Sequence, residues 1–129
     1  MKSLIVEDEL TSRMILQSLL QAYGDCNAVT DGHAAVNAFK DALQCGRPYD
    51  LICLDILMPN MDGHAALREI RKTEQEQNIT RGVTVIMITA QADPLNISHS
   101  VRGLCDAYII KPIDKEELDD KLRARGLIE

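Results

Sequence analysis

Five residues whose side chains suit metal or phosphate chemistry follow short apolar segments of the sequence. They are Glu7 and Asp8 after residues 3–6, Asp55 after residues 51–54, Thr89 after residues 83–88 and Lys111 after residues 107–110. Carboxylate oxygens suit Mg²⁺, a hard ion that keeps several waters and often shares its coordination shell with phosphate. A hydroxyl group and an amine can both hold phosphate oxygens.

Three carboxylates held close together repel one another, so they need a cation if all of them are to stay ionised. Lys111 can neutralise one carboxylate or hold a phosphate oxygen, and Thr89 can donate a hydrogen bond. An aspartate beside a divalent ion, such as Asp55, is equipped to accept a phosphoryl group, because that transfer needs mainly alignment and charge neutralisation. Each residue alone would be interpreted as solvated surface or a plain ion pair, but their joint placement favours one shared site.

The spacing of apolar residues predicts alternating strands and helices. Expected strands span residues 3–6, 26–30, 51–54, 83–88 and 107–110. Expected helices span about residues 10–23, 32–45, 64–75 and 95–103, and a last helix follows Asp114, with Glu117 as its capping-box partner. The polar stretch at residues 74–82 is interpreted as a loop.

Five successive strand–helix units imply a doubly wound parallel sheet with right-handed crossovers and helices on both faces. Ligands of such α/β folds bind at the carboxyl ends of the strands, near the point where the strand order reverses. The five polar residues begin at those ends, so this topology would gather them at one edge of the sheet.

Composition narrows the class of protein. The 129 residues carry 14 Lys and Arg against 20 Asp and Glu, a formal net charge of −6 that argues against a general nucleic-acid binder. Aromatic residues make up only 3%, which disfavours base-stacking surfaces and a flavin pocket flanked by rings. No apolar run reaches the ~18 residues that a membrane span needs. We expect a single cytoplasmic domain over residues 1–129, without membrane insertion.

The cysteines and histidines do not form a metal-binding or disulfide pattern. The cysteines at positions 26, 45, 53 and 105 are scattered and include no C-x-x-C pair. Cys53 lies in an apolar run and is expected to be a small buried hydrophobic residue. The histidines at positions 33, 64 and 99 are expected to be exposed helical side chains rather than zinc ligands.

The five polar residues lie in four stretches that are spread over nearly the whole chain. These are Leu4-Ile5-Val6-Glu7-Asp8-Glu9, Leu54-Asp55-Ile56-Leu57-Met58-Pro59-Asn60-Met61-Asp62-Gly63, Ile88-Thr89-Ala90 and Tyr108-Ile109-Ile110-Lys111-Pro112. Together they resemble the receiver domain of two-component response regulators, and the D-x-x-M-P-x-M-D-G stretch is highly specific by itself. The resemblance implies a flavodoxin-like α/β fold with five parallel strands in the order 2-1-3-4-5.

The resemblance also implies the metal site. Asp55 corresponds to the phosphoacceptor, and Asp8 and Asp55 correspond to direct Mg²⁺ ligands. Glu7 matches the second acidic position, which acts through water, and the backbone carbonyl of Leu57 would complete the protein's share of the metal shell. Glu7 departs from the aspartate of many relatives, and its carboxylate lies one methylene further out.

Further roles follow from the same resemblance. Thr89 and the Ala90 amide would bind phosphoryl oxygens, and Lys111 would pair with the phosphate. A cis peptide bond is expected before Pro112. Tyr108 matches the aromatic residue that changes rotamer when the Thr89 hydroxyl is drawn in, although it could equally be a half-buried strand tyrosine.

Two positions that tune dephosphorylation in the family are Leu57 and Gln91. An apolar Leu57 cannot hydrogen-bond an attacking water, whereas Gln91 can. The two positions point in opposite directions, so the sequence does not predict the lifetime of the phosphoryl group. The implied function is a phosphoacceptor in a phosphorelay, with weak Mg²⁺-dependent self-phosphorylation and self-dephosphorylation rather than enzymatic turnover.

The resemblance implies two kinds of partner. The phosphoryl donor would be a histidine kinase or a histidine phosphotransfer protein, and the output would reach a downstream protein by contact. The sequence ends soon after the last expected helix, which suggests a stand-alone receiver or one cut from a longer protein. Candidate contact residues are Asn96, Ile97, Val101, Tyr108 and Lys115.

Two other functions fit the sequence less well than that of a phosphoacceptor. A Mg²⁺-dependent phosphatase with an aspartyl nucleophile typically has a second Asp two residues later as its general acid, and that position holds Leu57. A degenerate receiver that only docks to partners is disfavoured because all five site positions hold competent residues.

Overall fold

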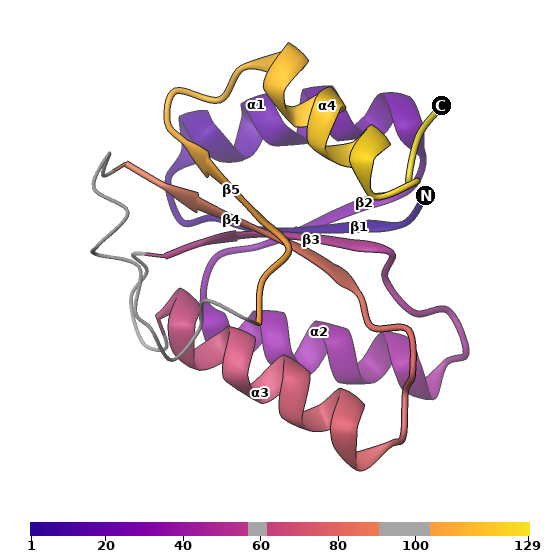
Figure 1. Ribbon diagram of the computed structural model, residues 1–129. Helices are drawn as coiled ribbons and strands as arrows, with labels where there is room; N and C mark the ends of the chain where they lie inside the picture. Colours follow the sequence, from indigo (N-terminus) through magenta and orange to yellow (C-terminus); the bar gives the residue numbers. More distant parts are fainter. Residues whose placement is uncertain (57–61, 91–103) are drawn as a thin grey trace.

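The computed structural model describes residues 1–56, 62–90 and 104–129 (Figure 1). Its elements are β1 (Ser3–Val6), α1 (Leu10–Leu20), the 3₁₀ helix η1 (Gln21–Tyr23), β2 (Cys26–Val29), α2 (Gly32–Gln44), β3 (Leu51–Asp55), α3 (Gly63–Glu76), β4 (Thr84–Thr89), β5 (Ala107–Ile110) and α4 (Lys115–Ala124). The strands form one parallel sheet in the order β2-β1-β3-β4-β5. This confirms the doubly wound sheet and the expected strand order. The helix expected at residues 95–103 lies outside the described residues.

Helices cover both faces of the sheet. Figure 1 shows α1 and α4 on one face and α2 and α3 on the other. Because successive strand residues point to opposite sides, β1 supplies both cores. Leu4 and Val6 pack in the core that includes Phe39 of α2, and Ile5 packs in the core that includes Leu118 of α4. Cys53 is fully buried in the second core, as the sequence predicts.

Aspartate side chains fix the starts of three helices. The carboxylates of Asp31, Asp62 and Asp114 accept hydrogen bonds from backbone N–H groups three residues later, at 2.8, 2.8 and 3.2 Å. Such caps satisfy N–H groups that have no partner within the first turn of a helix. The predicted cap at Asp114 is confirmed. The cap at Asp62 also fixes where α3 leaves the segment that follows Asp55.

Some element boundaries differ from those that the sequence predicts. The helix α3 ends at Glu76, one residue past the expected end at about residue 75, so residues 74–76 of the expected loop at 74–82 are helical. In this last turn the Glu74 carboxylate accepts a hydrogen bond from the Val83 N–H at 2.7 Å and therefore faces the protein. The strands β3 and β4 include Asp55 and Thr89 as their last residues. These two side chains are therefore held by the sheet rather than by loops.

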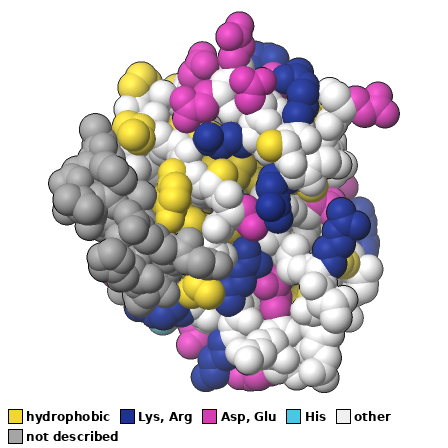
Figure 2. All heavy atoms as spheres, viewed as in Figure 1, with side chains coloured by type: hydrophobic (Ala, Val, Ile, Leu, Met, Phe, Trp, Pro, Cys, Tyr) yellow, Lys and Arg dark blue, Asp and Glu magenta, His cyan; other side chains and the backbone are white. Residues whose placement is uncertain are grey.

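Figure 2 shows how charge is distributed over one face of the molecule. Acidic side chains gather over α4, whose first turn carries Glu116 and Glu117. Lys and Arg side chains on this face are interspersed with acidic and neutral ones (Figure 2). The described residues on this face therefore form no continuous basic surface of the kind that binds nucleic-acid backbones.

A single arginine joins α3 to the starts of β4 and β5. The guanidinium of Arg71 donates to the carbonyl oxygens of Leu104 and Val83, at 2.7 and 2.8 Å. It also pairs with Glu74 at 2.8 Å and with Asp106 at 3.2 Å. These contacts lie at the edge of the sheet opposite Thr89 and Lys111, so they fix the two strands that carry those residues.

Replacing this arginine should destabilise the whole fold. We expect Arg71→Met to lower the free energy of unfolding by about 2–4 kcal/mol, because it leaves the nearly buried Glu74 without its cation. Urea unfolding at neutral pH measures the difference. The neighbouring Lys72→Met is the matched control, because Lys72 is exposed and its ion pair with Glu76 is long, at 4.0 Å. The effect of this substitution on the free energy of unfolding should stay within about 0.5 kcal/mol. Equal effects of the two substitutions would contradict the role of Arg71.

Candidate metal centre

The register of the sheet brings the predicted site residues to one edge. Val6 is level with Leu54, so Glu7 and Asp55 end neighbouring strands at the same height. On the other side of β3, Asp55 is level with Ile88 of β4. The Lys111 N–H donates to the Thr89 carbonyl at 2.7 Å and extends the pairing of β4 with β5. The four strand ends therefore meet, as the topology predicts.

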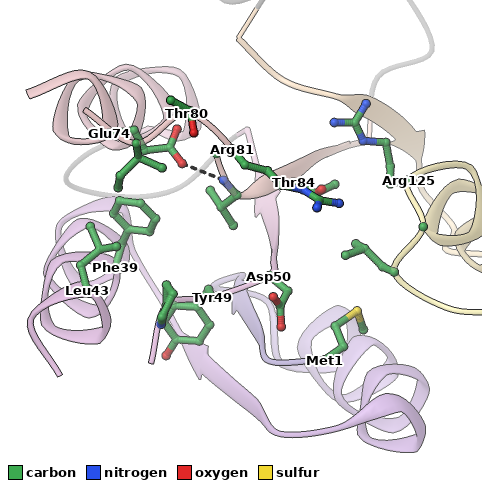
Figure 3. A pocket seen from close by; sticks show the side chains of 16 residues that line it. Met1, Phe39, Leu43, Tyr49, Asp50, Glu74, Thr80, Arg81, Thr84 and Arg125 are labelled. Atoms are coloured by element: carbon green, nitrogen blue, oxygen red, sulfur yellow. Dashed lines mark hydrogen bonds between the residues drawn. The ribbon is translucent and has the colours of Figure 1, made fainter. Parts of the chain in front are cut away.

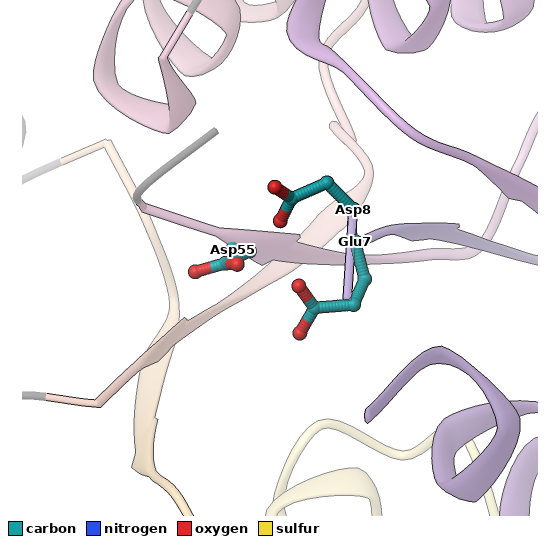
Figure 4. Close-up of side chains that lie close together, drawn as sticks. All are labelled: Glu7, Asp8 and Asp55. Atoms are coloured by element: carbon teal, nitrogen blue, oxygen red, sulfur yellow. The ribbon is translucent and has the colours of Figure 1, made fainter. Parts of the chain in front are cut away.

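Three carboxylates from these ends form one cluster. One oxygen each from Glu7, Asp8 and Asp55 lies within 4.8 Å of the others, and Figure 4 shows the three groups around a common space. Glu7 and Asp55 are buried, whereas Asp8 is exposed and leaves the cluster open to solvent. In the described part of the chain, no other group of three His, Cys, Asp or Glu residues meets the same distance limit. Clustered carboxylate oxygens that remain accessible to water fit Mg²⁺.

One lysine neutralises part of the cluster. The ammonium group of Lys111 lies 2.7 Å from Glu7 Oε1 and 3.6 Å from Asp55 Oδ2. The peptide bond from Lys111 to Pro112 is cis, as the resemblance implies. Lys111 alone cannot neutralise three carboxylates, so the cluster keeps a net negative charge that would favour binding of a cation.

Burial and ion pairing act against each other on these groups. Burial of Glu7 would raise its pKa, but its side-chain contacts with Asp55 and Lys111 outweigh burial and hold the pKa below its ordinary value. Burial of Lys111 would lower its pKa, but the hydrogen bond to Glu7 and the charge of Asp55 raise it above the ordinary lysine value. Both groups therefore carry their charges at neutral pH, and each depends on the other.

The structure describes only some of the remaining predicted residues. Thr89 is buried at the end of β4, which lies between the strands that precede Asp55 and Lys111, and Ala90 is exposed next to it. Tyr108 is half-buried on β5 and packs against the α2–α3 core. Leu57 and Gln91 lie outside the described residues. So do Asn96, Ile97 and Val101, whereas Lys115 is exposed and pairs with Asp119 at 2.6 Å.

Two residues near the cluster were missed by sequence reasoning. The Arg13 guanidinium donates to the carbonyl oxygens of Glu7 and Asp8 at 3.2 and 3.4 Å. A Cβ at Gly63 would lie 2.4 Å from the Asp55 carbonyl oxygen, so only glycine lets α3 start this close to the end of β3. The signal for Gly63 was its place in the D-x-x-M-P-x-M-D-G stretch. For Arg13 the only signal was a cation in the second turn of the helix that follows the acidic pair.

No cysteine or histidine among the described residues belongs to this acidic cluster. All four cysteines are free, and burial raises the pKa of Cys53 to about 12, so its thiol is inert. His33 is exposed, as expected, but His64 is half-buried rather than exposed. His99 lies outside the described residues.

A separate cavity of about 810 Å³ lies at the opposite edge of the sheet, where the strands begin (Figure 3). Its lining combines apolar residues such as Phe39 and Tyr49 with Arg81 and Arg125. The Glu74 carboxylate at its wall is already occupied by the Val83 N–H (Figure 3). None of the five predicted site residues belongs to this lining, so the cavity is distinct from the acidic cluster.

No helix within residues 1–56, 62–90 and 104–129 has the length and apolar character needed to cross a bilayer.

Comparison with known proteins gives a consistent result over nearly the whole chain. The family model described as "Response regulator receiver domain" matches residues 3–123. The two-component response regulator ORR41 from Oryza sativa subsp. japonica is 34% identical over 120 residues, which cover 89% of this chain and 86% of that protein. A probable transcriptional regulator, ycf27 from Guillardia theta, is 35% identical over 127 residues, 95% of this chain. The chain spans only 44–47% of the length of several ycf27 relatives that it matches.

A solved receiver structure shows the same fold. The receiver domain of the sensor histidine kinase PA1611 from Pseudomonas aeruginosa PAO1 superposes with a TM-score of 0.79 and 28% identity, covering 97% of each chain. That receiver was crystallised with a magnesium ion coordinated in its active site cleft.

The ion pair between Lys111 and Glu7 gives a pH-dependent prediction. We expect Lys111→Met to lower the free energy of unfolding at pH 7 by about 3 kcal/mol in chelator, because Glu7 is left charged and buried without its cation. Because the pKa of Glu7 is lowered on folding, its charge stabilises the folded wild type at pH values above the ordinary pKa of a glutamate. This contribution is lost as the pH falls through the lowered pKa. In the variant, Glu7 loses the contact with Lys111 while burial still opposes its charge, so protonation of Glu7 at acidic pH relieves the cost.

The difference between the two proteins should therefore shrink as pH falls from 7 towards 3. Urea unfolding across that range measures it, with Lys40→Met as the control, since Lys40 is exposed on α2. A difference that stays constant with pH would contradict the pairing of Lys111 with Glu7.

Proposed function

This chain belongs to the response regulator receiver family, and we propose that it is a phosphoacceptor whose Asp55 takes up a phosphoryl group in a Mg²⁺-dependent reaction. The phosphorylated chain then signals to a partner protein through a conformational switch. One observation carries the proposal: Glu7, Asp8 and Asp55 lie within 4.8 Å of one another beside Lys111. This arrangement gathers an acceptor carboxylate, oxygen ligands for a divalent ion and a fixed cation in one place.

Asp8 and Asp55 would hold Mg²⁺ directly, together with the backbone carbonyl of Leu57, and Glu7 would act through water. The close ion pair of Glu7 with Lys111 supports the indirect role, because it occupies one of the two glutamate oxygens. The bound ion would neutralise charge on the incoming phosphate. Asp8, the exposed member, leaves room for waters and for the phosphoryl donor.

In the transfer, an oxygen of Asp55 forms a bond to the phosphorus atom. The bond from phosphorus to the donor breaks, and its electron pair leaves with the donor, an imidazole nitrogen or an acetate oxygen. No oxidation or reduction is involved. Lys111, which lies 3.6 Å from Asp55, would pair with the transferred group, and Thr89 and the Ala90 amide would hold its other oxygens.

The switch would pass from Thr89 to Tyr108. A phosphoryl group brings about −1.5 to −2 charges, which would draw the Thr89 hydroxyl towards Asp55 and vacate space for the tyrosine ring. The half-buried position of Tyr108 on the neighbouring strand supports this route. Water attack on the phosphoryl group would end the signal, at a rate tuned by Leu57 and Gln91.

The family implies that the phosphoryl donor is a histidine kinase or a histidine phosphotransfer protein. The downstream target is a protein whose contact surface would include Tyr108 and Lys115, with Asn96, Ile97 and Val101. Residues 1–129 would act as a single receiver domain, with only weak self-phosphorylation and self-dephosphorylation of its own.

Labelling by a small phosphoryl donor tests this function. We expect acetyl phosphate with Mg²⁺ to add one phosphoryl group to the protein, and we expect no addition in chelator or in Asp55→Asn. Intact-mass spectrometry measures the addition. Asp120→Asn, which removes an exposed carboxylate on α4, is the control and should label like the wild type. Labelling of Asp55→Asn at the wild-type level would overturn the assignment.

A further inference from the structure

Arg13 contacts the acidic cluster through the main chain rather than through the carboxylates. Its Nη1 atom donates to the carbonyl oxygen of Glu7 at 3.2 Å and to that of Asp8 at 3.4 Å. These two residues form the start of the turn between β1 and α1, and they supply two of the three carboxylates. Arg13 itself is fixed in α1, where its N–H donates to the Glu9 carbonyl at 3.0 Å.

The guanidinium of Arg13 makes no ion pair within 4.0 Å of a carboxylate in the part of the chain that the structure describes. It is half-buried, which favours the use of its donors on nearby carbonyl groups. Its closest partners are therefore the carbonyls of the turn, and its charge is not used to neutralise the cluster directly.

The two carboxylates of the turn differ in how firmly their positions are fixed, so a contact that fixes Asp8 matters for the cluster. Glu7 is buried, its N–H donates to the Val29 carbonyl at 3.0 Å, and its side chain pairs with Lys111. Asp8 is exposed and lies close to two like charges that push it towards solvent. The contact of its carbonyl with Arg13 ties this outer residue back to α1.

We propose that Arg13 is a positioning residue that holds the Glu7–Asp8 turn in place, so that the Asp8 carboxylate meets Asp55 at the distance a divalent cation requires. This inference rests on the proposed function, since it concerns the same metal site. Groups that orient metal ligands from behind typically contribute about 10–100-fold to metal affinity.

Charge and positioning predict opposite signs for the loss of Arg13. A positive charge near the site repels Mg²⁺, so a neutral replacement would tighten metal binding if charge were the main effect. If Arg13 positions the turn, the same replacement weakens metal binding. The sign of the change therefore separates the two roles.

The test compares wild type, Arg13→Met, Arg13→Lys and Lys72→Met by calorimetric titration with MgCl₂ at fixed ionic strength. We expect Arg13→Met to bind Mg²⁺ about tenfold more weakly than wild type. Arg13→Lys keeps the charge, but its side chain is shorter and its ammonium group does not reach the position of Nη1, which donates to both carbonyl groups, so its affinity should fall between the two. Lys72→Met removes an exposed charge on α3 and should stay within about twofold of wild type.

Labelling with acetyl phosphate supplies a second measurement. In Arg13→Met the Mg²⁺ concentration for half-maximal labelling should rise about tenfold, while the rate at saturating Mg²⁺ stays near that of wild type. Melting in chelator checks that each variant is folded. If Arg13→Met does not fold, Arg13→Lys decides the question, and wild-type affinity in that variant overturns the proposal.

Unchanged or tighter Mg²⁺ binding by folded Arg13→Met would also overturn it. A wild type that binds Mg²⁺ but is not labelled at Asp55 would refute the proposed function, whereas the affinity comparison would still decide the role of Arg13. A wild type that does not bind Mg²⁺ would refute both.

Discussion

The main electrostatic constraint on this structure is the repulsion among three carboxylates that share one lysine. Two unit charges 4.8 Å apart, the upper limit of the separations in the cluster, repel by about 3.5 kcal/mol at an effective dielectric constant of about 20, before screening. Lys111 offsets part of this by pairing with Glu7 and, at a longer distance, with Asp55. The cluster keeps a net negative charge, and it is open to solvent at Asp8. Binding of a positively charged group therefore stabilises the folded site. A phosphoacceptor that depends on Mg²⁺ requires a site with this property.

The rest of the fold makes this unfavourable arrangement possible. Parallel pairing sets Glu7, Asp55 and Thr89 at the same edge, and helices on both faces bury the strands that carry them. Arg71 secures β4 and β5 at their opposite ends, and Gly63 lets α3 begin beside Asp55. The apolar cores and these polar anchors stabilise the sheet strongly enough to hold like charges together.

Much of this arrangement was accessible from the sequence, because it depends on local patterns. The buried run at residues 51–54 predicted a central strand, and Asp114 predicted a helix start. The site residues could be found because in a parallel sheet every strand end that carries chemistry lies on one edge. The strand order came from the resemblance to receivers, since hydrophobic periodicity does not specify which strands are neighbours.

Other features depend on contacts between distant residues and were not predictable. The hydrogen bond from the Val83 N–H to the Glu74 carboxylate joins α3 to a residue nine positions further along the chain. Arg71 binds Leu104 and Asp106, and no pattern in the sequence relates it to them. The sequence indicates that Lys111 can neutralise one carboxylate, but that its ammonium group lies closer to Glu7 than to Asp55 follows only from the distances.

The melting temperature of Asp55→Asn in chelator and in millimolar Mg²⁺ tests the central claim most directly. The substitution removes one of three crowded charges and keeps the shape, while Lys111 can still pair with Glu7. The variant should therefore melt a few degrees higher than wild type in chelator, on the order of the ~2–8 °C that 1 kcal/mol brings in domains near this size. Mg²⁺ should stabilise the wild type and have little effect on the variant. If Asp55→Asn melts lower in chelator and gains as much from Mg²⁺ as the wild type, the three carboxylates do not share one cation site.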